Sequence, residues 1–157
     1  MSGSGRPERT VDRPGFLIKL AQAALHAEMA RVLHEHGVAL AQFAVLTALA
    51  EEPGLSNADL ARRAFVTPQS MNEKLRELEQ RAWVRRGPHP AHRRIVQFEL
   101  TDEGREVLRA CDPDVTVIEQ RMLAELDLDQ RHQLVAALRS CIAALSPDSP
   151  MGSGGSE

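Results

Sequence analysis

Side chains that could read DNA bases recur along one face of a segment that starts near Thr67. The amides of Gln69 and Asn72 each offer a donor and an acceptor, which match the edge of adenine, and Arg76 could pair with guanine. On a helical wheel these positions lie opposite an apolar face that consists of Met71, Leu75, Leu78 and Ala82. The segment is therefore expected to form a helix that packs through its apolar face and could enter a major groove. An ordinary solvated face is the alternative interpretation.

A basic tract follows this segment directly. From Gln80 to Arg94 the chain has five arginines and two histidines but no acid. From Leu60 to Arg94 nine lysines and arginines stand against three glutamates, which gives a charge of +6. The whole chain carries -3, so the remainder carries -9. Such segregation is typical of a nucleic-acid-binding surface, because lysine and arginine neutralise phosphates.

Two short helices and a basic hairpin are predicted to position these residues. Ser56, with Asp59 three residues later, is typical of a capping box that starts one helix. Thr67 is the next expected N-cap, and Pro68 suits the first helical position because its missing N–H is not needed there. The stretches "AWVRR" and "RIVQFELT" are expected to be strands on either side of the loop "GPHPAHR". This order predicts a winged helix-turn-helix.

Further helices are expected on both sides of this unit. Residues 14–36 and about 40–50 carry apolar side chains at helical spacing. After the hairpin, Thr101 is expected to cap a long helix. That helix should continue through Pro113 as one kinked helix, since its apolar stripe keeps the same register on both sides.

The last helix is expected to start at a capping pair, Asp127 with Gln130. Its predicted buried stripe consists of Leu134, Leu138, Cys141 and Leu145. A small winged domain alone cannot cover the stripes of the terminal helices, so a homodimer is expected. The predicted fold class is mainly α with a small β-hairpin, a winged helix-turn-helix with N- and C-terminal dimerisation helices.

Length and composition limit the other possibilities. At 157 residues the chain suits one domain, or one domain with extra helices for oligomerisation, and 43% hydrophobic residues suffice for a core. Two cysteines without a C-x-x-C motif indicate neither a disulfide framework nor a zinc knuckle, and favour the cytoplasm. No secretory signal or membrane span is expected. The predicted boundaries are a disordered tail at 1–12, a dimerisation helix at 13–36, the winged domain at 37–101, dimerisation helices at 102–145 and a disordered tail at 146–157.

The segments "LSNADLARRAFVTPQSM" and "LTDEGR" resemble the MarR (multiple antibiotic resistance regulator) family of bacterial transcription factors. The resemblance covers roughly Pro14 to Leu145. It implies a winged helix-turn-helix and a dimer built from the first, fifth and sixth helices of both chains. Family members are mostly repressors whose DNA affinity changes when a small ligand, often an aromatic acid or phenol, binds between the DNA-binding and dimer lobes.

Carried over by position, the resemblance makes 67–76 the recognition helix and 85–94 the wing. Arg94 matches the family's wing arginine, but His92 stands where an acid usually precedes it. The predicted contacts with double-stranded DNA are Ser56, Thr67, Pro68, Gln69, Ser70, Asn72, Glu73, Arg76, Arg85, Arg86, His92, Arg93 and Arg94. The candidate walls of an effector pocket are His26, Met29, Phe43, Leu46 and Leu108, which an ordinary core explains equally well.

Other functions are weaker interpretations of this sequence. A winged-helix protein-interaction module is one alternative, and a regulator that senses oxidants through Cys111 or Cys141 is another, although both thiols are expected to be buried. His34 and His36 point to different faces of a helix, so no metal site is expected. No other cofactor is predicted. Phosphate-loop, nucleophile-elbow and zinc-protease motifs are all missing from the sequence, so we expect no enzyme.

Overall fold

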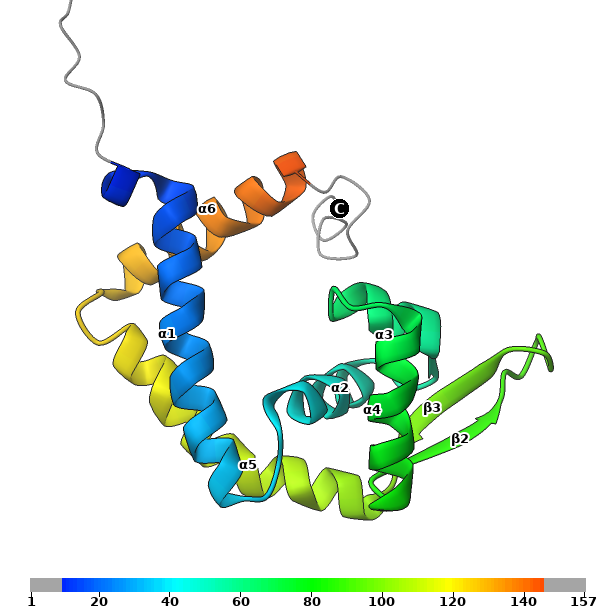
Figure 1. Ribbon diagram of the computed structural model, residues 1–157. Helices are drawn as coiled ribbons and strands as arrows, with labels where there is room; N and C mark the ends of the chain where they lie inside the picture. Colours follow the sequence, from blue (N-terminus) through cyan, green and yellow to red (C-terminus); the bar gives the residue numbers. More distant parts are fainter. Residues whose placement is uncertain (1–9, 146–157) are drawn as a thin grey trace, which may run out of the picture. The chain divides into compact units, whose positions relative to one another are not determined.

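The computed structural model describes residues 10–145, and the predicted C-terminal tail lies outside this range. Most of the predicted N-terminal tail also lies outside it, but Thr10–Asp12 forms a short 3-10 helix, η1. The described elements are α1 (Pro14–Glu35), α2 (Leu40–Glu51), β1 (Leu55–Ser56), α3 (Asn57–Arg63), α4 (Pro68–Gln80), β2 (Val84–Pro88), β3 (Val96–Leu100), α5 (Asp102–Met122) and α6 (Leu128–Leu145). The predicted helices are all present (Figure 1).

Local signals in the sequence explain most of the helix ends. Helix α1 has a proline at its first position, and Gly37 just beyond it adopts φ +68°, a conformation that glycine tolerates best. The Thr101 hydroxyl accepts the backbone N–H of Gly104 and thereby caps α5. Helix α5 continues through Pro113, as the register of its apolar stripe predicts.

The small sheet has three strands, one more than predicted. Its order is β1-β3-β2, and both pairs are antiparallel. Leu55 pairs with Phe98, so β1 joins the start of α3 to the hairpin. A strand of two residues is too short to show an alternating pattern, and for this reason the sequence did not reveal it.

Two apolar clusters hold the first part of the chain together. The winged core contains the buried residues Val45, Leu46, Leu49, Leu55, Leu60, Ala61, Met71, Leu75, Leu78, Val84, Phe98 and Leu100. The second cluster, called here the helix cluster, contains Val32, Leu33, Val38, Cys111 and Ile118. Trp83 is half-buried and packs against both clusters, so it connects them.

Two residues adopt a left-handed backbone without being glycine. Phe65, between α3 and α4, has φ +53°, and its side chain is 91% exposed. Ala82, just beyond α4, has φ +57° and is exposed. The prediction that Ala82 belongs to the apolar face of the helix was therefore wrong, because α4 ends at Gln80 and the helical wheel no longer applies.

Helix α6 begins as predicted but buries nothing within the single chain. Asp127 and Gln130 exchange hydrogen bonds of 2.8 and 2.9 Å between side chain and backbone, which is the expected capping pair. The expected buried stripe is wrong for an isolated chain, since Leu134, Leu138, Cys141 and Leu145 are all exposed. The described residues divide into two compact units, 10–118 and 119–145. In the described range no single helix is long and apolar enough to span a membrane. Helices α1 and α2 reach that length and apolar composition only together, and a bend of 89° separates them.

Candidate nucleic-acid interface

Side-chain caps begin both helices of the predicted helix-turn-helix. The Ser56 hydroxyl accepts the N–H of Asp59 at 3.2 Å, and the Asp59 carboxylate accepts the N–H of Ser56 at 3.1 Å. The Ser56 hydroxyl also donates to Asp59, and this hydrogen bond lowers the pKa of that carboxyl. Thr67 accepts the N–H of Ser70 at 3.1 Å. Ser56 and Thr67, both predicted DNA contacts, therefore already serve as caps.

One further side chain, which the sequence pattern did not predict, fixes the start of α4. The amide of Asn57, the first residue of α3, donates to the carbonyl of Pro68, the first residue of α4, at 3.1 Å. This bond ties the two helices together across the turn. An asparagine at the beginning of a helix usually suggests a cap, so its sequence position gave no sign of this contact.

The exposed face of α4 carries the predicted base-reading residues. Met71, Leu75 and Leu78 are buried in the winged core. The opposite face is solvent-exposed and includes Thr67, Pro68, Gln69, Asn72, Glu73 and Arg76, while Ser70 is half-buried. The structure therefore brings the predicted major-groove residues to one accessible face.

Two contacts fix the other end of α4 to the α1–α2 junction. The Gln42 amide, which is buried, donates to Glu77 at 3.2 Å and accepts the N–H of Ala39 at 3.0 Å. The Arg81 guanidinium donates to the carbonyl of Gly37 at 2.8 Å and lies over the ring of Trp83, 4.6 Å from its centre. Helix α4 is therefore held at both ends.

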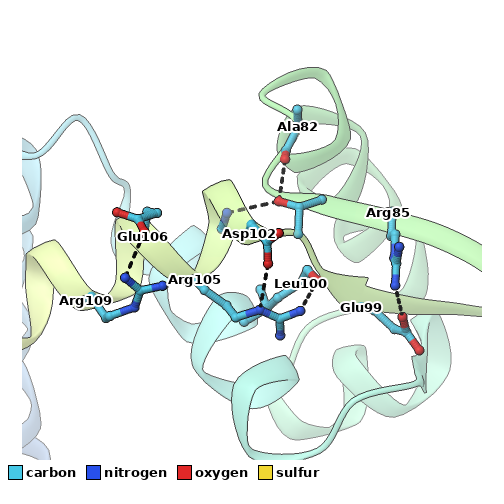
Figure 2. Close-up of polar contacts among 10 residues, drawn as sticks. Ala82, Arg85, Glu99, Leu100, Asp102, Arg105, Glu106 and Arg109 are labelled. Atoms are coloured by element: carbon cyan, nitrogen blue, oxygen red, sulfur yellow. Dashed lines mark hydrogen bonds and ion pairs between the residues drawn. The ribbon is translucent and has the colours of Figure 1, made fainter.

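The stem of the wing uses its arginines in ion pairs. Arg85 faces Glu99 across β2 and β3, and their side chains are 2.9 Å apart (Figure 2). Arg86 makes two hydrogen bonds with Glu79 of α4, and its guanidinium lies 5.9 Å from the centre of the Phe98 ring. The hydrogen bond from Arg86 lowers the pKa of Glu79, and the same bond raises the pKa of Arg86. Both arginines are thus neutralised by acids outside the acid-free tract.

The tip of the wing carries the remaining predicted wing residues. His92, Arg93 and Arg94 are all exposed there. Figure 1 shows the hairpin of β2 and β3 extending beside α4, and β2 contacts that helix. The tip and the exposed face of α4 therefore belong to the same unit, and a duplex could contact both.

The candidate effector residues are divided between the two clusters and the surface. Met29 and Phe43 are half-buried against the helix cluster. Leu46 is fully buried in the winged core and Leu108 is half-buried against it, whereas His26 is exposed. Of the five candidates, only Met29 of α1 and Phe43 of α2 pack against the same cluster, which also includes Cys111 and Ile118 of α5.

The cysteines and the remaining candidate histidines differ in environment. Cys111 is buried, and its burial, with a smaller effect from Asp114, raises the pKa of the thiol. A thiol in this state is a poor nucleophile. Cys141 is exposed, so its predicted burial was wrong for the single chain. His36 pairs with Asp114 at 2.7 Å, and the described residues contain no group of three or more ligands placed to hold a metal ion.

Comparisons with known proteins identify the fold and the family. The sequence model of the MarR family matches residues 36–95, which run from the end of α1 to the tip of the wing. The HTH-type transcriptional repressor Rv2887 of Mycobacterium tuberculosis is 36% identical over 119 residues, which are 76% of this chain and 86% of that protein. The chain belongs to the MarR family.

Solved structures of Rv2887 from M. tuberculosis agree with this assignment. Its complex with DNA superposes with a TM-score of 0.67 at 33% identity, covering 82% of this chain and 97% of that one. Its complex with salicylic acid superposes with a TM-score of 0.68 at 34% identity, covering 82% of this chain and 96% of that one. This MarR chain is a winged-helix transcriptional regulator, and the sequence resemblance to the family is confirmed.

Proposed function

We propose that this chain is a cytoplasmic repressor that binds a pseudo-palindromic DNA operator as a homodimer and is released by a small aromatic or phenolic ligand. The observation that carries the proposal is the position of Gln69, Asn72 and Arg76 on the exposed face of a capped helix, in the same unit as Arg93 and Arg94. Family membership and the DNA complex of Rv2887 support it.

Base reading is assigned to the first turns of α4. In helix-turn-helix proteins the N-terminal residues of the second helix contact base edges in the major groove. Gln69 and Asn72 lie there and are exposed. Two copies related by a two-fold axis would place two such helices about 34 Å apart, one turn of DNA.

Phosphate binding is assigned mainly to the wing tip. Arg93 and Arg94 are exposed there, whereas Arg85 and Arg86 are paired with acids in the stem. Contacts with phosphates position a protein without reading sequence. The proposed interface therefore separates specificity, on α4, from general affinity, on the wing tip.

The effector is proposed to bind beside the helix cluster. Met29 and Phe43 are half-buried there and offer apolar surface to an aromatic ring. Rv2887 has been solved with salicylic acid, which supports this class of ligand. Salicylate added to a preformed complex with DNA should raise the dissociation constant, and Phe43→Ala should reduce that response.

The decisive experiment compares binding isotherms on two duplexes at one salt concentration. One duplex is the DNA upstream of the chain's own gene, and the other has a random sequence. Gln69→Ala or Asn72→Ala should each cost about 1–3 kcal/mol on the specific duplex and much less on the random one. Gln80→Ala is the matched control, because Gln80 is exposed at the other end of α4. Equal losses on both duplexes would show that these amides do not read bases.

A salt titration tests the wing. Arg94→Ala should weaken binding to all duplexes and reduce the salt slope by about one. Arg139→Ala, an exposed arginine of α6, is the control and should leave the slope unchanged. A wild-type protein whose binding to duplex DNA hardly responds to salt would instead favour the protein-interaction module.

A further inference from the structure

The turn at the wing tip is closed by hydrogen bonds that converge on one histidine. The Nδ1 atom of His89 accepts the backbone N–H of Ala91 at 3.1 Å and that of His92 at 3.2 Å. The backbone N–H of His89 donates to the carbonyl of Ile95, and the N–H of Ile95 donates to the carbonyl of His92, both at 2.8 Å. The loop between β2 and β3 therefore folds around the His89 ring.

This geometry requires a particular protonation state of His89. A ring nitrogen that accepts two N–H groups carries no proton, so the proton of the neutral ring lies on Nε2. Asparagine and aspartate close turns in the same way, with a side-chain oxygen that accepts a backbone N–H two residues ahead. His89 performs this role with a nitrogen that can itself take up a proton.

Further basic groups surround His89 at the tip. The ring of His92 stacks on that of His89, with centres 5.4 Å apart and planes inclined by 29°. Arg93 and Arg94 follow directly, and the sequence from Gln80 to Arg94 contains no acid. The acids near the stem of the hairpin, Glu99 of β3 and Glu79 of α4, already pair with Arg85 and Arg86. A protonated His89 would therefore point an N–H at two N–H donors beside a positive cluster.

We propose that His89 is a positioning residue of the DNA interface, whose unprotonated Nδ1 shapes the turn that presents Arg93 and Arg94. The inference rests on the proposed DNA-binding function. It predicts that acid opens the turn and weakens the contribution of the wing to DNA binding. The competing hypothesis predicts the opposite effect of acid. If His89 contacted a phosphate as an imidazolium, acid would strengthen DNA binding.

The first test uses the free protein and measures amide hydrogen exchange at pH 8 and pH 5, the range in which histidine changes charge. Protection of the Ala91 and His92 amides, each relative to its intrinsic rate, should be present at pH 8 and lost at pH 5. His89→Asn should keep this protection at pH 8 and at pH 5, because the amide oxygen accepts the hydrogen bonds without changing charge. His89→Ala should show no protection of these amides at either pH. Equal protection in wild type and His89→Ala at pH 8 would overturn the proposal.

The second test measures affinity for a random-sequence duplex at the same two pH values. His89→Ala should bind about tenfold more weakly at pH 8, the equivalent of one charge-assisted hydrogen bond. His89→Asn should bind the duplex as tightly as wild type at pH 8 and more tightly than wild type at pH 5. His132→Asn, an exposed histidine of α6, is the control and should follow wild type at both.

The outcomes separate this inference from the proposed function. Binding by wild type and His89→Ala with equal affinity at pH 8 would refute the positioning role alone. Tighter binding of wild type than His89→Asn at pH 5 would also refute it, because His89 would then contact phosphate as a cation. A wild-type protein that binds neither this duplex nor the DNA upstream of its gene would refute the proposed function, and the positioning role with it.

Discussion

Helices α4 and α6 both carry leucines at helical spacing, but the environments of these leucines are opposite. In the winged core the stripe of α4, Met71, Leu75 and Leu78, is at most 1% exposed. In α6, Leu134 and Leu138 are each 38% exposed, and the helix has no buried residue in the described range. The difference shows that periodicity predicts which face of a helix is apolar, but not whether its own chain covers that face.

The largest difference should appear when one leucine is truncated in each region. Leu75→Ala should lower the free energy of unfolding by about 2–5 kcal/mol, because it leaves a cavity in a closed core. Leu138→Ala should instead weaken dimerisation, so its effect on stability should depend on protein concentration. Urea unfolding at several concentrations, with sedimentation velocity, measures both. The comparison would fail if wild type were monomeric, or if both losses were equal at every concentration.

Two glycines in helices sharpen the comparison at a smaller scale. A Cβ at Gly104 would lie 2.1 Å from the carbonyl oxygen of Trp83, whereas one at Gly15 in α1 would meet nothing within 4 Å. Gly104→Ala should therefore cost about 1–3 kcal/mol or more through overpacking. Gly15→Ala should be neutral or stabilise by up to about 1 kcal/mol, since alanine favours helix. Thermal or urea unfolding measures the stability of both variants. A Gly104→Ala protein as stable as wild type would contradict the close contact between Gly104 and Trp83.

The smallest effects concern two exposed alanines and should have opposite signs. Ala82→Gly should stabilise by about 0.5 kcal/mol, because relief of a left-handed alanine, about 1–2 kcal/mol, slightly exceeds the entropy cost of glycine. Ala136→Gly, at an exposed position inside α6, should destabilise by about 0.5–1 kcal/mol. Urea titrations of both variants beside wild type can resolve the sign of each change in the free energy of unfolding. Destabilisation by both substitutions would show that the backbone of Ala82 is not strained.

The fold was largely predictable because its signals are local. Ser56, Thr67 and Thr101 each accept, as a cap, the backbone N–H of the residue three positions ahead. The uninterrupted register of α5 across Pro113 is also a property of the sequence alone. The strand β1 was missed because its two residues are too few to show an alternating pattern, and only its pairing with the distant strand β3 defines it. Ala82 was misplaced because a periodic pattern does not show where a helix ends.

The candidate site was less predictable, because its geometry depends on contacts between distant segments. The charge count treated Arg85 and Arg86 as available cations, but strand register and the packing of α4 pair them with Glu99 and Glu79. The link between Asn57 and Pro68 likewise crosses the turn between two helices. The leucines of α6 were predicted to be buried but are exposed, because periodicity does not show what covers an apolar face.

The attachment of α4 at both ends has a consequence for the entropy of binding. Its first residue is held by Asn57, and its last turn is held by Gln42 and Arg81. The backbone of the helix is therefore ordered before DNA arrives, and association should restrict mainly the exposed side chains, at about 0.5–1.5 kcal/mol for each one immobilised. Most of the conformational entropy lost on binding should then come from long side chains such as Arg76, Arg93 and Arg94, which are exposed in the free protein.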